Sequence, residues 1–409
     1  MNEKKIINDP IHGFISIPTK LIFKVINHPY FQRLRRIKQL GLTDLVYPGA
    51  LHTRFHHALG AMHLMNTALE VLKSKGHKIS AKEKQAALLA ILLHDIGHGP
   101  FSHALEHSIL SNIHHEKLSL LIMEQLNIQF KGKLTLAIEM FCNRYERKFF
   151  YQLISSQLDM DRLDYLQRDA FFTGVKEGKI ALNRIIRMLD LHQGKIVIEE
   201  KGIYSIENFL NTRRLMYWQV YLHKTSVSAE QMLIQVVRRA KELTQKGADI
   251  FATPSLKLFF DKNVTLSSIK QTPQYLDAFS QLDDYDVWTS IKIWTTHQDK
   301  VLSILSNMLL QRDLFRAELT NEPPSALLIE TYIDRISKHF GLTKIEADYF
   351  CLTGNVTNAA YLPNTQLINI KTQKGKIKDI AKASDLPNIE ALSKIVTKYY
   401  LCYPKIVSL

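Results

Sequence analysis

A histidine and an aspartate stand side by side, as His94-Asp95, directly after the eight apolar residues 86–93. Desolvating an imidazole and a carboxylate costs free energy unless something compensates them. A divalent cation would compensate both, and a mixture of carboxylate oxygen and imidazole nitrogen favours Mn, Fe, Zn or Ni over Ca. The alternative is a helix C-terminus at which His94 and His98 cap carbonyl groups while Asp95 is solvated. The pair by itself leaves both interpretations open.

Other groups that could bind a metal or transfer protons cluster around this pair in the sequence. Eleven of the 17 histidines fall between positions 52 and 115, and four carboxylates lie within residues 159–169. At about 100° per residue, one face of an α-helix collects Asp161, Asp164, Tyr165, Arg168 and Asp169. Asp159 points the opposite way, so we assign it outward and to a structural role. The clustering indicates a site rather than scattered surface histidines.

The order of the motifs along the chain resembles that of the HD-domain phosphohydrolases. The likeness is to the branch of dNTP triphosphohydrolases that contains the SAM-and-HD-domain enzymes of animals and their bacterial relatives. The matching segments are Asn8–Gly13, Phe31–Gly41, His94–His103 and Tyr221–Lys224. The resemblance runs from about residue 5 to the C-terminus and thins between residues 240 and 330. No SAM domain precedes the matching region, so functions of that module are not expected.

The resemblance implies a metal site and a set of catalytic groups. The metal ligands would be His57, His94, Asp95 and Asp161, which leave positions for water and a phosphate oxygen. The cofactor expected is a divalent transition metal (Mn, Fe, Zn or Ni), with additional Mg as an option. Glycines in the turn after this pair permit close approach of phosphate. The catalytic positions on or after this turn are His98 and His103 near the α-phosphate, and His115 with Glu116 as general acid or relay.

The resemblance also implies contacts along the length of a nucleotide. The triphosphate would be held by cationic groups that suit phosphate oxygens, namely Arg54, Arg213, Lys224 and Arg162, the last in place of a lysine common in relatives. The sugar would contact Gln39 and Leu40 at its 2′ position and Tyr165 and Asp169 at its 3′-hydroxyl. The base would lie beside Tyr221 and His223. Four further histidines match no such role and are expected to be structural: His52, His56, His63 and His114.

These positions predict the reaction dNTP + H2O giving deoxynucleoside and triphosphate. A second hypothesis is another HD hydrolase reaction, on an alarmone or a cyclic nucleotide. A third is a non-catalytic nucleotide- or nucleic-acid-binding HD protein. The matches at Gln39-Leu40 and Tyr221–Lys224 favour the first, because they belong to the dNTPase pocket and not to the metal core.

An N-terminal nucleotide site between subunits drives tetramer formation in the animal relatives. The matching positions here are Lys5, Ile6, Asn27, Gln32 and Arg35. Position 27 is Asn where those relatives have Asp, and an amide offers one carbonyl acceptor where a carboxylate accepts twice. We therefore predict a homo-oligomer, a tetramer, whose activity depends on a dNTP activator but not strictly on GTP. The alternative is that these residues only build a subunit interface.

Composition restricts the class of protein. The 409 residues carry a formal net charge of +14, from 53 Lys+Arg against 39 Asp+Glu, which suits polyanionic partners such as nucleotides. The basic stretch 371–378 lacks aromatic interleaving, so we interpret it as a solvated turn between strands, and a nucleic-acid partner is only weakly supported. No secretory signal is visible, and the longest apolar run is far short of the ~20 residues that span a bilayer. Three widely separated cysteines indicate a reducing compartment, and we expect a cytoplasmic protein without membrane contact.

The elements that must carry these residues are mostly helical. Residues 1–17 predict a short hairpin, and helical periodicity predicts helices at 30–40, 54–74, 80–96, 103–110, 115–127, 133–143, 156–172, 206–222 and 325–341. Ser80 with Glu83 forms a capping box, and Ser205 caps the helix at 206. Further strands are predicted at 196–199 with 202–204, at 349–353 and at 366–370. The expected fold is mostly α, with an HD-type helical core and small hairpins in residues 1–240 and a helical and α+β lobe in residues 241–409.

Overall fold

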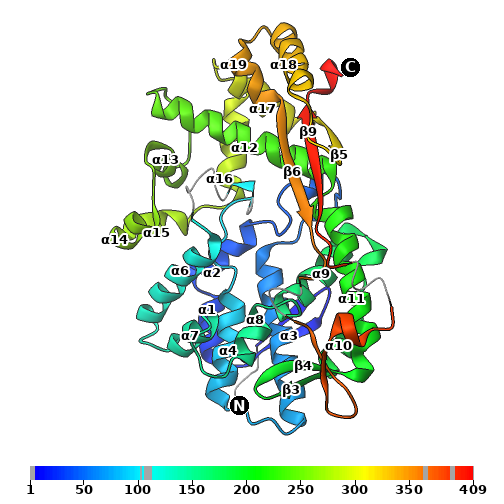
Figure 1. The fold of residues 1–409 in the computed structure, drawn as a ribbon. Helices are drawn as coiled ribbons and strands as arrows, with labels where there is room; N and C mark the ends of the chain where they lie inside the picture. The colour runs from blue at the N-terminus through cyan, green and yellow to red at the C-terminus, as the bar shows by residue number, and fades with distance from the viewer. Residues whose placement is uncertain (1–4, 102–103, 106–112, 363–366, 387–391, 409) are drawn as a thin grey trace.

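The computed structural model describes residues 5–101, 104–105, 113–362, 367–386 and 392–408. These residues form a mostly α-helical fold with three small sheets, as expected (Figure 1). The N-terminal helices α1–α11 occupy the lower half of the view, and α16–α19 lie in the upper half with the long strands β6 and β9 beside them. Among the described residues, no helix combines the length and apolarity needed to cross a lipid bilayer.

Three helices pack together in the lower half: α3 (Arg54–Ser74), α4 (Ala81–Leu93) and α9 (Met160–Thr173). α4 begins at the predicted capping box, in which the Ser80 hydroxyl accepts from the Glu83 N–H and the Glu83 carboxylate accepts from the Ser80 N–H at 2.8 Å. Its nine buried residues include the whole apolar run, so the helix ends inside the protein at the His-Asp pair. His94 and Asp95 therefore lie in a buried position, where the free-energy cost of removing them from water must be offset by polar contacts or a cation.

The other helices fall into two sets along the chain. In the N-terminal half they are α1 (Lys20–Ile26), α2 (Pro29–Gln32), α6 (His115–Gln129), α7 (Thr135–Phe141), α8 (Phe149–Ile154), α10 (Leu182–Arg187) and α11 (Ile203–Met216). In the C-terminal half they are α12 (Lys224–Gln245), α13 (Pro254–Asp261), α14 (Leu266–Gln271), α15 (Pro273–Phe279), α16 (Asp284–Trp294), α17 (Lys300–Leu310), α18 (Ala326–Phe340), α19 (Lys344–Ala347) and α20 (Ile380–Ala383). The predicted helix at 103–110 falls largely outside the described residues.

The strands form three sheets. The N-terminal hairpin pairs β1 (Lys5–Asp9) with β2 (Gly13–Ile17), as predicted. A second sheet has the order β3 (Leu189–His192), β4 (Lys195–Glu199), β7 (Asn369–Lys371) and β8 (Ile377–Asp379), and only its β4–β7 pair is parallel. A third places β9 (Val396–Tyr403) between β5 (Arg316–Thr320) and β6 (Leu352–Asn358). The basic stretch forms the turn between β7 and β8, which confirms its interpretation as a solvated turn.

Several predicted elements need correction. The helix expected at 30–40 consists of the single turn α2 and a 3₁₀ turn at Arg33–Arg36, because the next residues bond to other parts of the chain. The hairpin partner of β4 is β3 and not 202–204, since residues from Ile203 onward already belong to α11. Ser205 consequently lies inside α11 and does not cap it. The strand expected at 349–353 starts later, as β6, after a 3₁₀ turn at Asp348–Phe350.

Candidate active site

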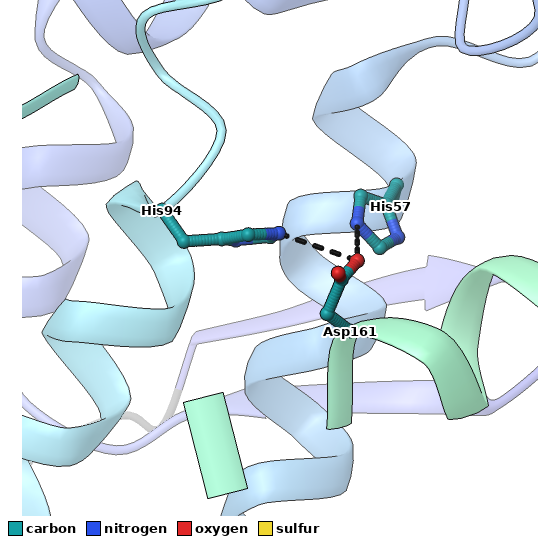
Figure 2. A group of neighbouring side chains, drawn as sticks. All are labelled: His57, His94 and Asp161. Atoms are coloured by element: carbon teal, nitrogen blue, oxygen red, sulfur yellow. Dashed lines mark ion pairs between the residues drawn. The ribbon is translucent and has the colours of Figure 1, made fainter. Parts of the chain in front are cut away.

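Side chains from α3, the end of α4 and the start of α9 meet at one point. Figure 2 shows the Asp161 carboxylate between the imidazoles of His57 and His94. Asp161 Oδ1 lies 3.0 Å from His57 Nε2 and 3.4 Å from His94 Nε2. One ligand atom from each residue falls within 4.8 Å of the others, which is close enough for one cation to bind all three. These are three of the four predicted metal ligands.

The second nitrogen of each imidazole is already occupied. His57 Nδ1 lies 2.8 Å from Asp164 Oδ2, and His94 Nδ1 lies 2.6 Å from the carbonyl oxygen of Ile91. Both acceptors require a proton on Nδ1, so Nε2 is the nitrogen of each ring that could bind a cation. Within the described part of the chain, neither buried Nε2 makes a well-formed hydrogen bond, although the Asp161 carboxylate lies close to both. Orienting metal-bound histidines through the second ring nitrogen is a general feature of metal sites, so the donor set fits a divalent cation.

The fourth predicted ligand, Asp95, lies between this triad and two further polar side chains, those of His98 and Arg54. Its Oδ1 lies 3.3 Å from His94 Nε2 and 3.4 Å from His98 Nε2. Its Oδ2 lies 3.9 Å from His57 Nε2 and accepts a hydrogen bond from Arg54 Nη1 at 2.5 Å. Asp95 can thus reach a cation in the triad while its other partners neutralise its charge.

The charges of the site depend on these contacts. Burial lowers the pKa of His57, but the carboxylates of Asp161 and Asp164 more than offset this effect and raise it to about 10. Burial raises the pKa of Asp161, and the two imidazoles reverse that effect and bring it below its ordinary value. Burial and the Arg54 charge lower the pKa of His98 well below its ordinary value. His98 is therefore neutral, whereas His57 carries a proton that a cation would displace.

The turn after the pair is fixed against α6. Any side chain at Gly97 would place its Cβ 2.2 Å from the Ser119 nitrogen, so only glycine allows this contact. Ser119 Oγ accepts from the Gly97 N–H at 2.9 Å and donates to the His94 carbonyl at 2.7 Å. The rings of His98 and His115 stack with centroids 3.8 Å apart. Glu116 is exposed on the first turn of α6, and His103 lies outside the described residues.

A cavity of about 480 Å³ opens beside these groups. Its walls include predicted metal, catalytic and substrate positions: Gln39, Leu40, Arg54, Asp95, His98, His115, Asp161, Tyr165, Asp169 and Tyr221. Sequence reasoning missed six further lining residues: Gly41, Thr43, Phe101, Tyr217, Leu222 and Glu230. Leu222 and Phe101 fall within matched motifs, and Tyr217 precedes Tyr221 by one turn, so these could have been found. No signal in the sequence indicates Glu230, which lies on α12 far from the HD motif.

Hydrogen bonds fix the wall of the cavity formed by α9. Asp169 Oδ1 lies 2.7 Å from His52 Nε2, and its Oδ2 accepts from the Tyr221 hydroxyl at 2.8 Å. Both oxygens of Asp169 are thus used to join α9 to neighbouring segments. Gln39 Oε1, by contrast, is buried without a hydrogen-bond partner among the described residues. Its amide could therefore bond to a molecule in the cavity.

Four predicted substrate residues do not line this cavity. Arg162 turns its guanidinium to Asp159 and the Ser156 carbonyl, and Lys224 is exposed at the start of α12. His223 caps that helix, with Nδ1 accepting from the Thr225 N–H at 3.2 Å. Arg213 is buried on α11 over the ring of Tyr217, and its Nε and Nη1 lack hydrogen-bond partners in the described structure. Of these four, Arg213 is the one whose buried charge still needs an anion.

The other histidines of the cluster have structural contacts. His56 forms the capping box of α3 with Thr53, and the ring of His63 stacks on His12. His114 is the N-cap residue of α6. The prediction that Asp159 faces outward is wrong, because its side chain is fully buried and accepts from the Arg162 N–H at 2.7 Å. It caps α9, so the structural role is confirmed even though the direction is not.

The predicted regulatory positions lie at the N-terminal surface. Gln32 Nε2 donates to the Ile26 carbonyl at 2.7 Å, beside the exposed Asn27, and Gln32 Oε1 accepts from Arg35 Nε at 2.9 Å. Arg35 in turn stacks on Phe55. Gln32 and Arg35 are thus bonded to each other, whereas the Asn27 side chain donates to the Phe23 carbonyl of its own helix. Lys5 and Ile6 are exposed on β1.

Comparisons with known proteins agree with this site. The HD domain description matches residues 54–169, and the HD associated region matches residues 180–254. A solved phosphohydrolase from Bacteroides thetaiotaomicron superposes with a TM-score of 0.95 at 52% identity, covering 98% of this chain and all of that one. The uncharacterized protein YwfO of Bacillus subtilis is 33% identical over 99% of this chain and 93% of its own length.

A more distant relative has a named activity. The deoxynucleoside triphosphate triphosphohydrolase SAMHD1 homolog of Dictyostelium discoideum is 31% identical over 58% of this chain, and the match spans half of that protein. The HD description covers α3, α4 and α9, the three helices that supply His57, His94 and Asp161. On the strength of these matches, the chain belongs to the HD-domain phosphohydrolase family.

Proposed function

We propose that this chain is a metal-dependent deoxynucleoside triphosphate triphosphohydrolase. The observation that carries the proposal is the cavity, which is lined both by Asp95, Asp161 and His98 and by the residues matched to sugar contacts, Gln39 and Leu40. Metal-binding and proton-transfer groups at one part of a cavity suit hydrolysis of a phosphate ester. Aromatic side chains in the same walls suit a sugar and a base. The SAMHD1-named relatives support the choice of a dNTP as substrate.

The proposed reaction breaks the bond between the α-phosphorus and the 5′ oxygen of the nucleotide. Water adds its hydroxyl to the phosphorus, and the 5′ oxygen takes up the proton, so triphosphate and a deoxynucleoside result. A divalent cation bound by His57, His94 and Asp161, with Asp95, would stabilise phosphate charge and lower the pKa of water. Arg54 is available to the phosphate oxygens through the same cavity.

Proton transfer is assigned to the stacked pair of imidazoles. His98 lines the cavity and is neutral because burial and Arg54 lower its pKa, so it would be present as the uncharged imidazole. His115 lies against it with ring centroids 3.8 Å apart and is the proposed acid for the 5′ oxygen. Leu40 and Gln39 would exclude a ribose by packing closely against the sugar, so that no space is left for a 2′-hydroxyl.

The test is a product analysis with all four dNTPs. Purified protein is incubated with Mn2+ or Mg2+, and the products are separated by ion-exchange chromatography and followed by 31P NMR. Inorganic triphosphate and deoxynucleoside in equal amounts are expected. Pyrophosphate or monophosphate as the phosphorus product would contradict the proposed bond cleavage. Parallel incubations with a cyclic nucleotide and an alarmone test the other HD reactions.

We further propose that the protein works as a nucleotide-dependent homo-oligomer, a tetramer, through the surface that carries Lys5, Ile6, Asn27, Gln32 and Arg35. Arg35 and Lys5 could bind phosphate groups of an activator, and Gln32 and Asn27 offer amides to its base. Size-exclusion chromatography with and without each dNTP, run beside the activity assay, tests this. A fully active monomer would contradict it.

A further inference from the structure

The turn of the N-terminal hairpin reaches the candidate metal centre, although about 45 residues separate it from His57 in the sequence. His12 Nε2 lies 2.6 Å from Asp164 Oδ1, and Asp164 Oδ2 lies 2.8 Å from His57 Nδ1. One carboxylate thus joins the hairpin to a histidine of the metal triad. The side chain of Asp164 is fully buried, and that of His12 is 5% exposed, so water does not screen this connection.

Arg168 completes the connection from the opposite side. It donates from Nε to Asp164 Oδ2 at 2.9 Å and from Nη2 to Asp164 Oδ1 at 3.0 Å. Its Nη1 donates to Asp9 Oδ2 at 2.8 Å. Asp9 also accepts from the N–H groups of Ile11 and His12, both at 3.0 Å, and so shapes the turn that presents His12. The hairpin is therefore tied to α9 twice, through His12 and through Asp9.

The charges of this network favour His57 as a ligand. Two carboxylates, Asp9 and Asp164, meet one guanidinium, and Asp164 Oδ2 accepts from His57 Nδ1–H at 2.8 Å. A carboxylate that accepts from the second ring nitrogen fixes the orientation of a metal-bound imidazole and raises its basicity.

Close packing leaves Asp164 no alternative position. A Cβ at Gly60 of α3 would lie 1.9 Å from Asp164 Oδ1 and 2.3 Å from Arg168 Nη2, so the network occupies the space of a missing side chain. His63, one turn further along α3, stacks on His12 with centroids 5.2 Å apart. The surroundings thus hold His12 and Asp164 in one arrangement, as a device for precise positioning requires.

We propose that His12 is a positioning residue of the metal site, which acts through Asp164 on the ring of His57. The N-terminal hairpin is then a structural part of the metal centre and not only a surface element. Because coupling free energies are reciprocal, a bound metal must also stabilise the hairpin. This inference rests on a cation at His57, His94 and Asp161, and it does not require that the substrate be a dNTP.

The test measures metal affinity directly, without substrate. Mn2+ is titrated into chelator-treated full-length protein, and binding is followed by calorimetry for the parent, His12→Ala and His12→Gln. Loss of such an outer partner weakens metal binding about 10- to 100-fold in known sites, and we expect His12→Ala in that range. His12→Gln, whose amide can donate to Asp164, should recover part of the affinity. The matched control is His77→Ala, which removes a histidine paired with a different carboxylate, Asp190, at 2.6 Å and has no bond to Asp164, so it should bind Mn2+ like the parent.

A second measurement separates positioning from a general loss of structure. Hydrogen exchange of the backbone amides in β1 and β2 should slow when Mn2+ binds the parent, and this response should be absent in His12→Ala. If His12→Ala does not fold, Asp164→Asn, which keeps the shape but removes the charge, is tested in the same way. Parent-like Mn2+ affinity in a folded His12→Ala or Asp164→Asn protein would overturn the proposal. Failure to hydrolyse dNTPs would contradict the proposed function and leave this inference intact.

Discussion

Metal binding should release a proton from His57. In the metal-free protein the neighbouring carboxylates raise the pKa of His57 to about 10, so its Nε2 carries a proton at neutral pH. A cation that binds this nitrogen must displace the proton. At pH 7 the deprotonated fraction is about one in a thousand, since the pH lies about three units below the pKa. Apparent affinity for the metal should therefore increase about tenfold for each pH unit between 7 and 9.

The same pKa determines how stability depends on pH. The folded value lies above the unfolded value of 6.5, so protonated His57 stabilises the metal-free fold fully below about pH 6.5. That contribution is lost as the pH rises through about 10. A bound metal takes the place of the His57 proton, so the metal-bound protein does not depend on that contribution. The loss of stability at high pH should therefore occur only in chelator-treated protein. Thermal melts between pH 6 and 10, with and without Mn2+, compare the two states.

Calorimetry in buffers of different ionisation enthalpy measures the proton directly. His57 is expected to release about one proton per bound Mn2+ at pH 7.5, and His57→Ala should both weaken binding and lower the release by about one proton. Burial lowers the pKa of His94, but Asp95 and Asp161 more than offset this and raise it, so His94 can release a further part of a proton. His115→Ala, which alters the same cavity outside the triad, serves as the matched control and should release the proton normally. Binding without proton release in the parent would refute the assignment of a protonated His57.

Four other outcomes follow from the site. The double variant His94→Ala, Asp95→Ala should lose bound metal and all hydrolysis while circular dichroism stays helical; parent-like turnover would contradict the metal site. The parent should cleave dNTPs at least tenfold faster than NTPs, and Leu40→Ala should reduce that ratio, as measured by kcat/KM for dATP and ATP. Burial raises the pKa of Glu230 to about 7, so this cavity residue becomes a carboxylate as the pH rises through 7. A carboxylate accepts hydrogen bonds only, so it should then favour nucleotides whose bases carry an amino group. The dGTP to dTTP ratio of kcat/KM should accordingly rise from pH 6 to 8 and be flat in Glu230→Gln. Asn27→Asp should increase the dependence on GTP or dGTP as activator, and strict GTP dependence of the parent would contradict the role given to Asn27.

The family resemblance named the metal ligands, and the structure brings three of them, His57, His94 and Asp161, together. The apolar run before His94 becomes the buried helix α4, and the spacing of Asp161, Tyr165 and Asp169 turns all three to the cavity. The predicted polar face of α9 nevertheless serves two different sites. Asp164 and Arg168 lie on its other edge and contact the hairpin. Periodicity gives the direction of a side chain but not the element that packs against it.

Contacts between distant segments account for the errors in the fold. Helical periodicity at 30–40 is overridden because the Lys38 N–H donates to Asp284 at 2.8 Å and the Gln39 N–H donates to the His52 carbonyl at 2.9 Å. Neither partner can be identified from the local pattern. Propensity is a weak preference that tertiary contacts of this kind routinely outweigh. For the same reason Glu230, whose neighbours come from residues 39–43, carried no signal in its own helix.

Asp284 explains why residues outside the HD segment belong to the cavity. From the start of α16 its Oδ2 accepts from the Lys38 N–H at 2.8 Å, and its Oδ1 accepts from the Phe101 N–H at 2.9 Å. Lys38 precedes the proposed sugar contacts, and Phe101 lies in the matched segment that begins at His94. One carboxylate of the C-terminal half therefore sets the spacing between the sugar side of the cavity and the metal side. The HD helices carry the three candidate metal ligands, whereas the shape of the cavity also depends on α12, which contributes Glu230, and on α16, which contributes Asp284.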